Sequence, residues 1–185
     1  SVYQEAGATI VASADDLYAQ SEIVLKVRGP NADELAMMRK DAVLVGLLAP
    51  HQQDNIAALA QHGITAFAME KLPRISRAQN MDVLSSQANI AGYKAVIMAA
   101  NVYQRFFPML MTAAGTVKAA RVLVLGAGVA GLQAIATAKR LGAVVEAFDV
   151  RPATKEQVES LGAKFIEVPL SDEEKIAALQ IHAAE

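Results

Sequence analysis

The chain has 185 residues, of which 54% are hydrophobic, and its formal net charge is −2. This composition supports a core for one domain or two small ones, and the lack of basic excess argues against a nucleic-acid partner. Because there is no cysteine, disulfides and thiolate metal sites are excluded. The three histidines show no metal-ligand spacing, so no metal site is expected.

Strand and helix patterns alternate in the first section of the chain. Short strands are predicted at 8–11, 22–27, 42–48 and 64–69, with helices at 15–20, 32–40 and 52–61. Ser13 and Asn31 are typical N-caps, and Gly63 is a typical helix terminator. This βα rhythm predicts a parallel sheet with helices on both faces.

The rhythm breaks after residue 69. A polar stretch leads into a long helical pattern at 81–103, and a less regular segment follows at 106–115. Alternation resumes with predicted strands at 121–125, 144–149 and 164–168 and helices at 129–139, 154–161 and 171–184, the last opened by a Ser171–Glu174 capping box. We therefore predict three regions: an N-terminal α/β domain at 1–80, a connecting helix and linker at 81–117, and a nucleotide domain at 118–185.

The segment Arg121-Val-Leu-Val-Leu-Gly-Ala-Gly-Val-Ala-Gly131 is a strand, a glycine turn and a helix start. In a dinucleotide fold, Gly126 permits the tight turn, Gly128 lets the backbone approach the pyrophosphate, and Gly131 lets the helix pack closely on the strand. The helix N-terminus then offers N–H groups to the phosphates. Asp149, 18 residues after Gly131, ends the next strand, where a carboxylate can accept hydrogen bonds from both adenosine-ribose hydroxyls.

Asp149 also bears on the choice of cofactor. A carboxylate at the ribose would repel a 2′-phosphate, which favours NAD(H) over NADP(H). Arg151 leaves two interpretations open: it could receive a 2′-phosphate, or it could be a solvated loop charge before Pro152.

A second group of polar residues follows the strand predicted at 64–69. Gln79, Asp82, Ser85 and Ser86 are spaced three or four apart, so they share one helical face or its entry turn, and two arginines precede them. Polar residues at the C-terminal end of a parallel strand are typical of α/β sites. The ordinary alternative is the solvated stripe of an amphipathic helix.

Several of these motifs together resemble a known family. Pro73-Arg-Ile-Ser-Arg-Ala-Gln79, Met81-Asp-Val-Leu-Ser-Ser-Gln-Ala-Asn-Ile-Ala-Gly-Tyr93, Met111-Thr-Ala-Ala-Gly115, the segment from Gly126 to Gly142 and Lys155-Glu-Gln-Val-Glu-Ser-Leu-Gly162 are similar to the NAD(H)-binding domain of the alpha subunit of proton-translocating NAD(P) transhydrogenases, in the alanine dehydrogenase/pyridine nucleotide transhydrogenase family. The resemblance runs from about residue 8 to 169, and the segment 171–185 lies outside it. It implies two Rossmann-like parallel-sheet domains joined by a long helix, and both would be incomplete in this chain.

The resemblance implies roles for residues in both groups. Those near the nicotinamide and its ribose would be Arg74, Ile75, Ser76, Arg77, Gln79, Asp82 and Ser85, with Arg74, Gln79, Asp82 and Ser85 as the catalytic set. Those at the pyrophosphate would be Gly126, Gly128, Val129, Ala130 and Gly131, and those at the adenosine ribose Asp149, Val150 and Arg151. The nicotinamide would lie in a cleft between the domains.

The function implied is hydride transfer from NADH to NADP⁺ on a partner domain, coupled to proton movement through a membrane domain. NAD(H) would be the cofactor, the chain would form a homodimer, and it would act as a peripheral domain at the cytoplasmic face of the inner membrane. Hydride transfer between two nicotinamides needs positioning and exclusion of water rather than an acid, a base or a metal. The arginine, glutamine, aspartate and serine side chains suit that task.

Two alternatives remain at this point. An alanine dehydrogenase would need a lysine and a histidine near its substrate, but the family's lysine falls on Arg28, and His51 lies beyond the strand end where the histidine is expected. An arginine cannot lose its proton to act as a base. The other alternative is a non-catalytic NAD(H)-sensing module, which would bind the nucleotide without hydride exchange.

Overall fold

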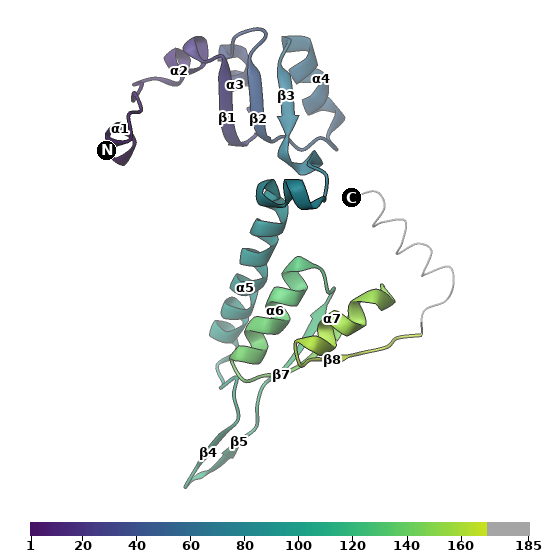
Figure 1. Ribbon diagram of the computed structural model, residues 1–185. Helices are drawn as coiled ribbons and strands as arrows, with labels where there is room; N and C mark the ends of the chain where they lie inside the picture. Colours follow the sequence, from purple (N-terminus) through teal and green to yellow (C-terminus); the bar gives the residue numbers. More distant parts are fainter. Residues whose placement is uncertain (170–185) are drawn as a thin grey trace. The chain divides into compact units, whose positions relative to one another are not determined.

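The computed structural model describes residues 1–169 (Figure 1). The chain divides into two compact units, Ser1–Leu84 and Ser85–Glu185, and each has its own hydrophobic core. The helix predicted at 171–184, with its Ser171–Glu174 capping box, lies outside the described residues.

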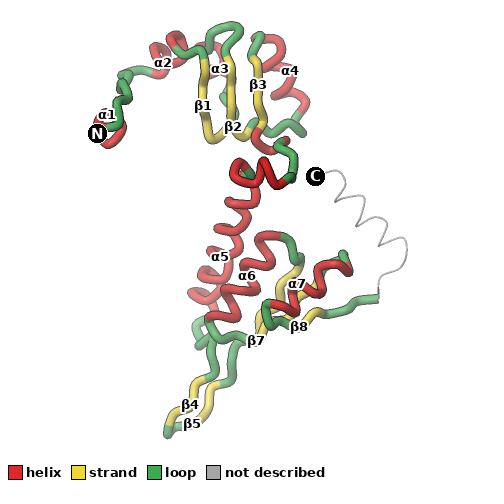
Figure 2. Tube along the Cα trace, viewed as in Figure 1, coloured by secondary structure: helices red, strands yellow, loops and turns green. Residues whose placement is uncertain are grey.

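The first unit is a three-stranded parallel sheet in the order β1-β2-β3, flanked by short helices (Figures 1 and 2). Its elements are α1 (Val2–Glu5), α2 (Ala14–Gln20), β1 (Ile23–Arg28), α3 (Ala32–Met37), β2 (Val43–Leu47), α4 (Gln53–His62), β3 (Thr65–Ala68) and the 3₁₀ turns η1 (Met69–Lys71) and η2 (Ser76–Met81). The parallel strands and connecting helices confirm the predicted βα alternation.

Local capping explains where these helices begin and end. The Ser13 side chain accepts a hydrogen bond from Asp16 N, and Asn31 forms a capping box with Glu34. Gly63 ends α4 with a φ of 82°, a conformation that glycine adopts readily. The strand predicted at 8–11 is wrong, because this mostly exposed segment pairs with no described strand.

The core of the first unit lies on one face of its sheet. Val24 of β1 and Leu44 of β2 are buried with side chains from the helices and loops, namely Tyr18, Met38, Leu48 and Leu59. The alternate residues of β1, Ile23, Leu25 and Val27, are 64%, 75% and 80% exposed. The prediction of helices on both faces is therefore wrong for the described residues.

The second unit contains a long helix, a hairpin and a parallel three-stranded sheet in the order β6-β7-β8 (Figure 1). Its elements are α5 (Val83–Tyr103), β4 (Leu110–Thr112), β5 (Gly115–Val117), β6 (Arg121–Leu125), α6 (Val129–Arg140), β7 (Val144–Phe148), η3 (Pro152–Thr154), α7 (Lys155–Ser160) and β8 (Lys164–Phe165). The segment 106–115, predicted to be less regular, contains β4, which pairs antiparallel with β5 to form a hairpin. Its two-residue turn, Ala113-Ala114, lacks the glycine or asparagine that marks such turns in a sequence.

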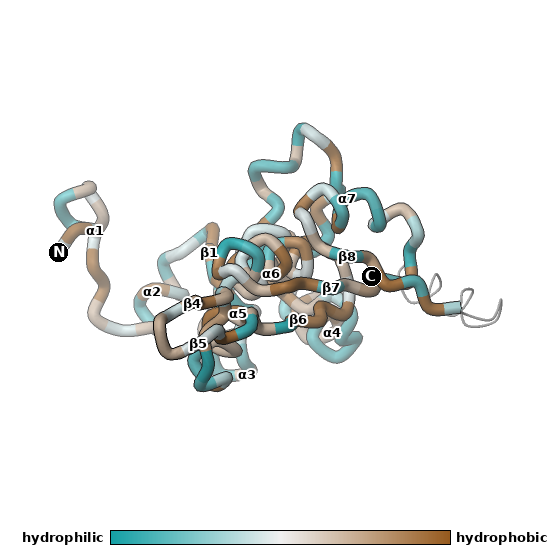
Figure 3. Tube along the Cα trace, turned by 90° about the horizontal axis from the view of Figure 1, so that it is seen from below, coloured by the Kyte–Doolittle hydropathy of each residue, from teal (hydrophilic) through white to brown (hydrophobic). Residues whose placement is uncertain are grey.

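The core of the second unit also lies on one face of its sheet. Val145 and Ala147 of β7, a strand drawn largely in the hydrophobic colour in Figure 3, are buried with Ile135 and Ala138 of α6 and Val158 of α7. On the opposite face, Leu123 and Leu125 of β6 are 56% and 73% exposed. Here too the described helices cover a single face.

Helices α5 and α6 approach each other at a glycine. A Cβ placed on Gly92 would lie 2.1 Å from the carbonyl oxygen of Ala130, much closer than two non-bonded atoms can sit. Because Ala130 belongs to the first turn of α6, this contact fixes the long helix against the end of α6 that follows the glycine loop.

We predict that Gly92→Ala destabilises the second unit. Helix propensity alone would make the substitution stabilising by about 1 kcal/mol, whereas the steric conflict should cost about 1–3 kcal/mol. Urea denaturation measures the net effect, and Ala95→Gly at an exposed position of α5 measures the propensity difference alone. A more stable Gly92→Ala variant would show that the helices do not pack this closely.

Candidate functional site

The glycine loop joins the end of β6 to the start of α6. Gly126 has a φ of 94°, and its N–H donates to the Phe148 carbonyl at 2.8 Å, which ties the loop to the end of β7. Gly128 is the N-cap of α6, and no side chain caps the helix. The first turn of α6 therefore begins with backbone N–H groups that no capping side chain satisfies, which is the arrangement that binds phosphate groups.

Gly131 and Gly128 of this loop differ in the space that surrounds them. A Cβ on Gly131 would lie 1.8 Å from the Gly126 carbonyl oxygen, so only glycine allows the helix to start this close to the strand. A Cβ on Gly128 would meet nothing within 4 Å. The loop is thus tight on its protein side at Gly131 and open above Gly128, as a bound diphosphate requires.

Asp149, directly after β7, is 8% exposed and holds the loop from the side. Its Oδ2 accepts a hydrogen bond from Ala127 N at 2.7 Å and another from Arg151 Nη2 at 3.0 Å. Its Oδ1 accepts from Arg151 N at 2.8 Å and from Arg151 Nε at 2.9 Å. One carboxylate therefore links the end of β7, the glycine loop and the segment that follows.

These donors determine the charge of Asp149. Burial acts to raise its pKa, but the hydrogen bonds from the Arg151 side chain and from the N–H groups of Arg151 and Ala127 outweigh burial and hold the pKa at about 2. Asp149 is consequently ionised throughout the physiological pH range.

Arg151 is not the solvated loop charge that one interpretation of the sequence offered. Its side chain is only 32% exposed and forms a two-pronged ion pair with Asp149. Val150 between them is 37% exposed.

The second group of predicted site residues surrounds a cavity in the first unit. The cavity has a volume of about 280 Å³ and is lined by Pro73, Arg74, Ile75, Ser76, Gln79 and Asp82. The structure thus brings together five of the residues that the family resemblance assigns to the nicotinamide end. Arg77 is exposed and does not line this cavity, and Ser85 lies beyond the boundary of the first unit.

The turn η2 explains this arrangement. Residues 76–81 form a 3₁₀ helix, with Ala78 buried beneath it, before α5 begins at Val83. Gln79 and Asp82 therefore lie in the entry turn rather than in the helix, which is the second of the two placements that their spacing allowed.

Glu70, in η1 shortly before the cavity residues, makes contacts that the sequence did not reveal. Its two carboxylate oxygens accept hydrogen bonds from Leu48 N at 3.1 Å and Ala49 N at 2.8 Å. Ala49 has a φ of 49°, which is uncommon for a residue with a side chain. Glu70 thereby fixes the loop after β2 to the segment that leads into the cavity.

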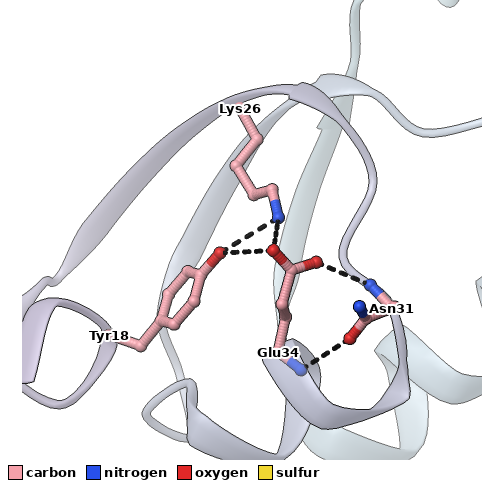
Figure 4. A network of polar contacts seen from close by, with 4 residues as sticks. All are labelled: Tyr18, Lys26, Asn31 and Glu34. Atoms are coloured by element: carbon pink, nitrogen blue, oxygen red, sulfur yellow. Dashed lines mark hydrogen bonds and ion pairs between the residues drawn. The ribbon is translucent and has the colours of Figure 1, made fainter. Parts of the chain in front are cut away.

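A separate polar network joins α2, β1 and α3 (Figure 4). Lys26 of β1 donates hydrogen bonds to the Glu34 carboxylate and, at 3.0 Å, to the Tyr18 hydroxyl, which in turn donates to Glu34 at 3.2 Å. Partial burial acts to lower the pKa of Lys26, but the hydrogen bonds to Glu34 and Tyr18 outweigh it and raise the pKa above its ordinary value. Lys26 is therefore a charged structural partner and is poorly suited to act as a base.

Two further kinds of feature are absent from the described residues. Within residues 1–169, no cluster of histidine and carboxylate side chains could hold a metal ion. None of the helices in that range combines the length and the hydrophobicity needed to cross a membrane.

The sequence matches two halves of one family. Its residues 1–91 match the model of the alanine dehydrogenase/PNT N-terminal domain, and its residues 95–184 match that of the C-terminal domain. The second match includes most of the segment 171–185, so the expectation that this segment lies outside the resemblance is wrong.

Individual relatives agree with this assignment. One piece of the NAD(P) transhydrogenase alpha subunit of Rhodospirillum rubrum is 60% identical over 169 residues, which cover 88% of this chain and 44% of the relative. The transhydrogenase structure from Sinorhizobium meliloti is 56% identical, with a TM-score of 0.83, over 99% of this chain and 52% of that chain. An L-alanine dehydrogenase structure is 30% identical, with a TM-score of 0.73, over 90% of this chain and 47% of that one. The chain thus spans about half the length of these relatives.

The two parallel-sheet units, one of them with a glycine loop between strand and helix, place this protein among the Rossmann-like α/β proteins. The chain belongs to the alanine dehydrogenase/PNT family. Relatives that are 49–60% identical to it carry the name of the transhydrogenase alpha subunit. Two alanine dehydrogenases are more distant, at 31% and 28% identity.

We predict that Asp149→Asn lowers the free energy of unfolding at pH 7 by about 1–2 kcal/mol, an estimate reduced for partial solvation of the Arg151 guanidinium. Because folding depresses the pKa of Asp149 to about 2, its contribution is complete above the unfolded-state value near 4. It is lost as the pH falls from about 4 to 2.

Urea denaturation at several pH values checks this prediction. The difference between wild type and Asp149→Asn should shrink below pH 4, while Glu159→Gln, an exposed carboxylate in the same unit, serves as the control. A difference that stays constant down to pH 2 would contradict the ion pair.

Proposed function

We propose that this chain is the NAD(H)-binding component of an NAD(P) transhydrogenase, in which NADH passes a hydride to NADP⁺ held by a partner domain. The observation that carries the proposal is the glycine loop clamped to the carboxylate at the end of β7, where Asp149 accepts a hydrogen bond from Ala127 N. The similarity to transhydrogenase alpha subunits supports the same conclusion.

The second unit would hold the adenosine and diphosphate portion of the nucleotide. The open space at Gly128 and the uncapped first turn of α6 suit two phosphates, with Gly126, Val129, Ala130 and Gly131 completing the loop. Asp149, Val150 and Arg151 follow β7, where the adenosine ribose of a bound dinucleotide lies in this fold. The ionised Asp149 would disfavour a 2′-phosphate, so we propose NAD(H) as the cofactor.

The residues around the cavity of the first unit would position the nicotinamide end. NAD supplies the hydride chemistry when it is bound, and the protein contributes orientation and exclusion of water. Arg74, Gln79, Asp82 and Ser85 are proposed as the residues nearest the reaction, with Ile75, Ser76 and Arg77 supporting them. We also propose that the chain is divided into three regions, with boundaries at residues 80 and 117.

The partners proposed are those that this reaction requires. An NADP(H)-binding domain would receive the hydride, and a membrane domain would couple the transfer to proton translocation. The chain would act at the cytoplasmic face of the inner membrane as one subunit of a homodimer. The similarity to transhydrogenase alpha subunits supports association with further transhydrogenase domains.

The test of this function is hydride exchange between NADH and an NADP⁺ analogue after an NADP(H)-binding transhydrogenase domain is added. We expect exchange that depends on both proteins and requires no added metal, and NADH alone should bind to the chain with a change in nicotinamide fluorescence. Binding without exchange would favour a sensing module. Production of NADH from NAD⁺ and L-alanine would contradict the proposal, and the presence of Arg28 where the family's lysine is expected argues against that outcome.

We predict that Asp149→Ser shifts selectivity toward NADP(H) by roughly tenfold or more, which corresponds to about 1.4 kcal/mol. The substitution removes the charge that repels a 2′-phosphate and leaves Arg151 able to contact it. Parallel titrations with NADH and NADPH measure the ratio of affinities, and Glu159→Gln controls for net charge. An unchanged ratio would show that Asp149 does not lie at the ribose.

A further inference from the structure

The hydrogen-bonding capacity of Asp149 is fully used within the protein. An ionised carboxylate has about four acceptor positions, two on each oxygen. In the structure Oδ1 accepts from Arg151 N and Nε, and Oδ2 accepts from Ala127 N and Arg151 Nη2. A ribose with two hydroxyl groups would therefore find no vacant acceptor on this side chain.

Two of the four donors belong to fixed backbone. Ala127 lies in the glycine loop, whose neighbour Gly126 is tied to Phe148, and Gly131 leaves no space for the loop to move toward the helix. The backbone at Arg151 is held as well, because its carbonyl accepts from both Thr154 N at 3.1 Å and Thr154 Oγ1 at 2.8 Å. Thr154 is itself buried.

The other two donors, Nε and Nη2 of Arg151, are on a side chain that can rotate. The side chain is 32% exposed, so a path to solvent is open to the guanidinium. Its two nitrogens are on adjacent positions of a planar fork and reach both carboxylate oxygens, which is the pattern that the two hydroxyls of a ribose would reproduce.

We infer that the Arg151 side chain is a specificity-determining residue that occupies the ribose position on Asp149 and must be displaced when the adenosine ribose binds. This inference rests on the proposed nucleotide-binding function. Without a ligand, Arg151 keeps the buried carboxylate hydrogen-bonded. When Arg151 is displaced, only a ligand with two ribose hydroxyls can replace both of the bonds that are lost.

The consequence is that removing this side chain strengthens ribose binding. We expect Arg151→Ala to bind 5′-AMP about tenfold more tightly than wild type, since charge-assisted hydrogen bonds no longer have to be broken. Binding of 2′-deoxy-AMP should strengthen at least as much, because in the wild type its single hydroxyl cannot replace both bonds to Arg151, so the preference for 5′-AMP should narrow. Arg151→Gln, a less disruptive variant, should give a smaller gain of the same sign.

Displacement of NADH fluorescence by each nucleotide measures these affinities, with Arg140→Ala at an exposed position of the same unit as the control for lost charge. Weaker binding of 5′-AMP to both Arg151 variants would overturn the inference, because Arg151 would then be a direct ligand contact. A preference for 5′-AMP over 2′-deoxy-AMP that widens in the Arg151 variants would also overturn it, because Arg151 would then not be the group that enforces the requirement for two hydroxyls.

A second measurement does not depend on nucleotide binding. The carboxyl carbon of Asp149, followed by NMR, should titrate near pH 2 in wild type and at higher pH in the Arg151 variants. If Asp149 titrates at lower pH in wild type than in the Arg151 variants but wild type binds no NADH, the proposed function is contradicted, and this inference with it. A wild type that binds NADH while the variants bind 5′-AMP unchanged would contradict this inference alone.

Discussion

The second unit is organised by a single carboxylate at the end of β7. Asp149 binds the glycine loop through Ala127 N, its own following turn through Arg151 N, and the Arg151 guanidinium. A buried anion is tolerated only when such donors surround it. Asp149 therefore determines both the position of the glycine loop and the negative charge beside it, and its removal affects both.

Close backbone contacts supply the stiffness that this arrangement needs. Gly131 allows α6 to begin against the Gly126 carbonyl, and Gly92 allows α5 to pack against the Ala130 carbonyl in the same turn. The first turn of α6 is thus held from two sides by backbone rather than by flexible side chains. N–H groups fixed in this way can bind a phosphate without a further loss of conformational entropy.

The sequence predicted the elements whose signals are local. Glycine spacing located the loop, and Ser13, Asn31 and Gly63 located helix ends, because each acts through its own backbone. The Asp149–Arg151 contact also has a local sequence signal, because an aspartate often accepts a hydrogen bond from the backbone N–H two residues later. The β4–β5 hairpin and the Glu70 contacts depend on pairing between segments, and composition does not encode such pairing. The cavity residues were proposed from the family resemblance, and their roles remain predictions.

Under the proposed function, the contrast between fixed and movable groups explains how the loop and the carboxylate would divide the task of recognition. No side chain caps α6 at the glycine loop, so the loop would recognise a diphosphate through backbone N–H groups. Because a diphosphate is common to many nucleotides, the loop would not distinguish among them. Discrimination requires a group whose interaction energy differs between ligands, and we propose that Asp149 provides it through its charge. If Arg151 neutralised that charge permanently, the repulsion of a 2′-phosphate would weaken. An arginine that leaves when the ribose arrives would avoid this conflict, because the carboxylate would be paired without a ligand and would face the nucleotide with its own charge when the ligand is bound.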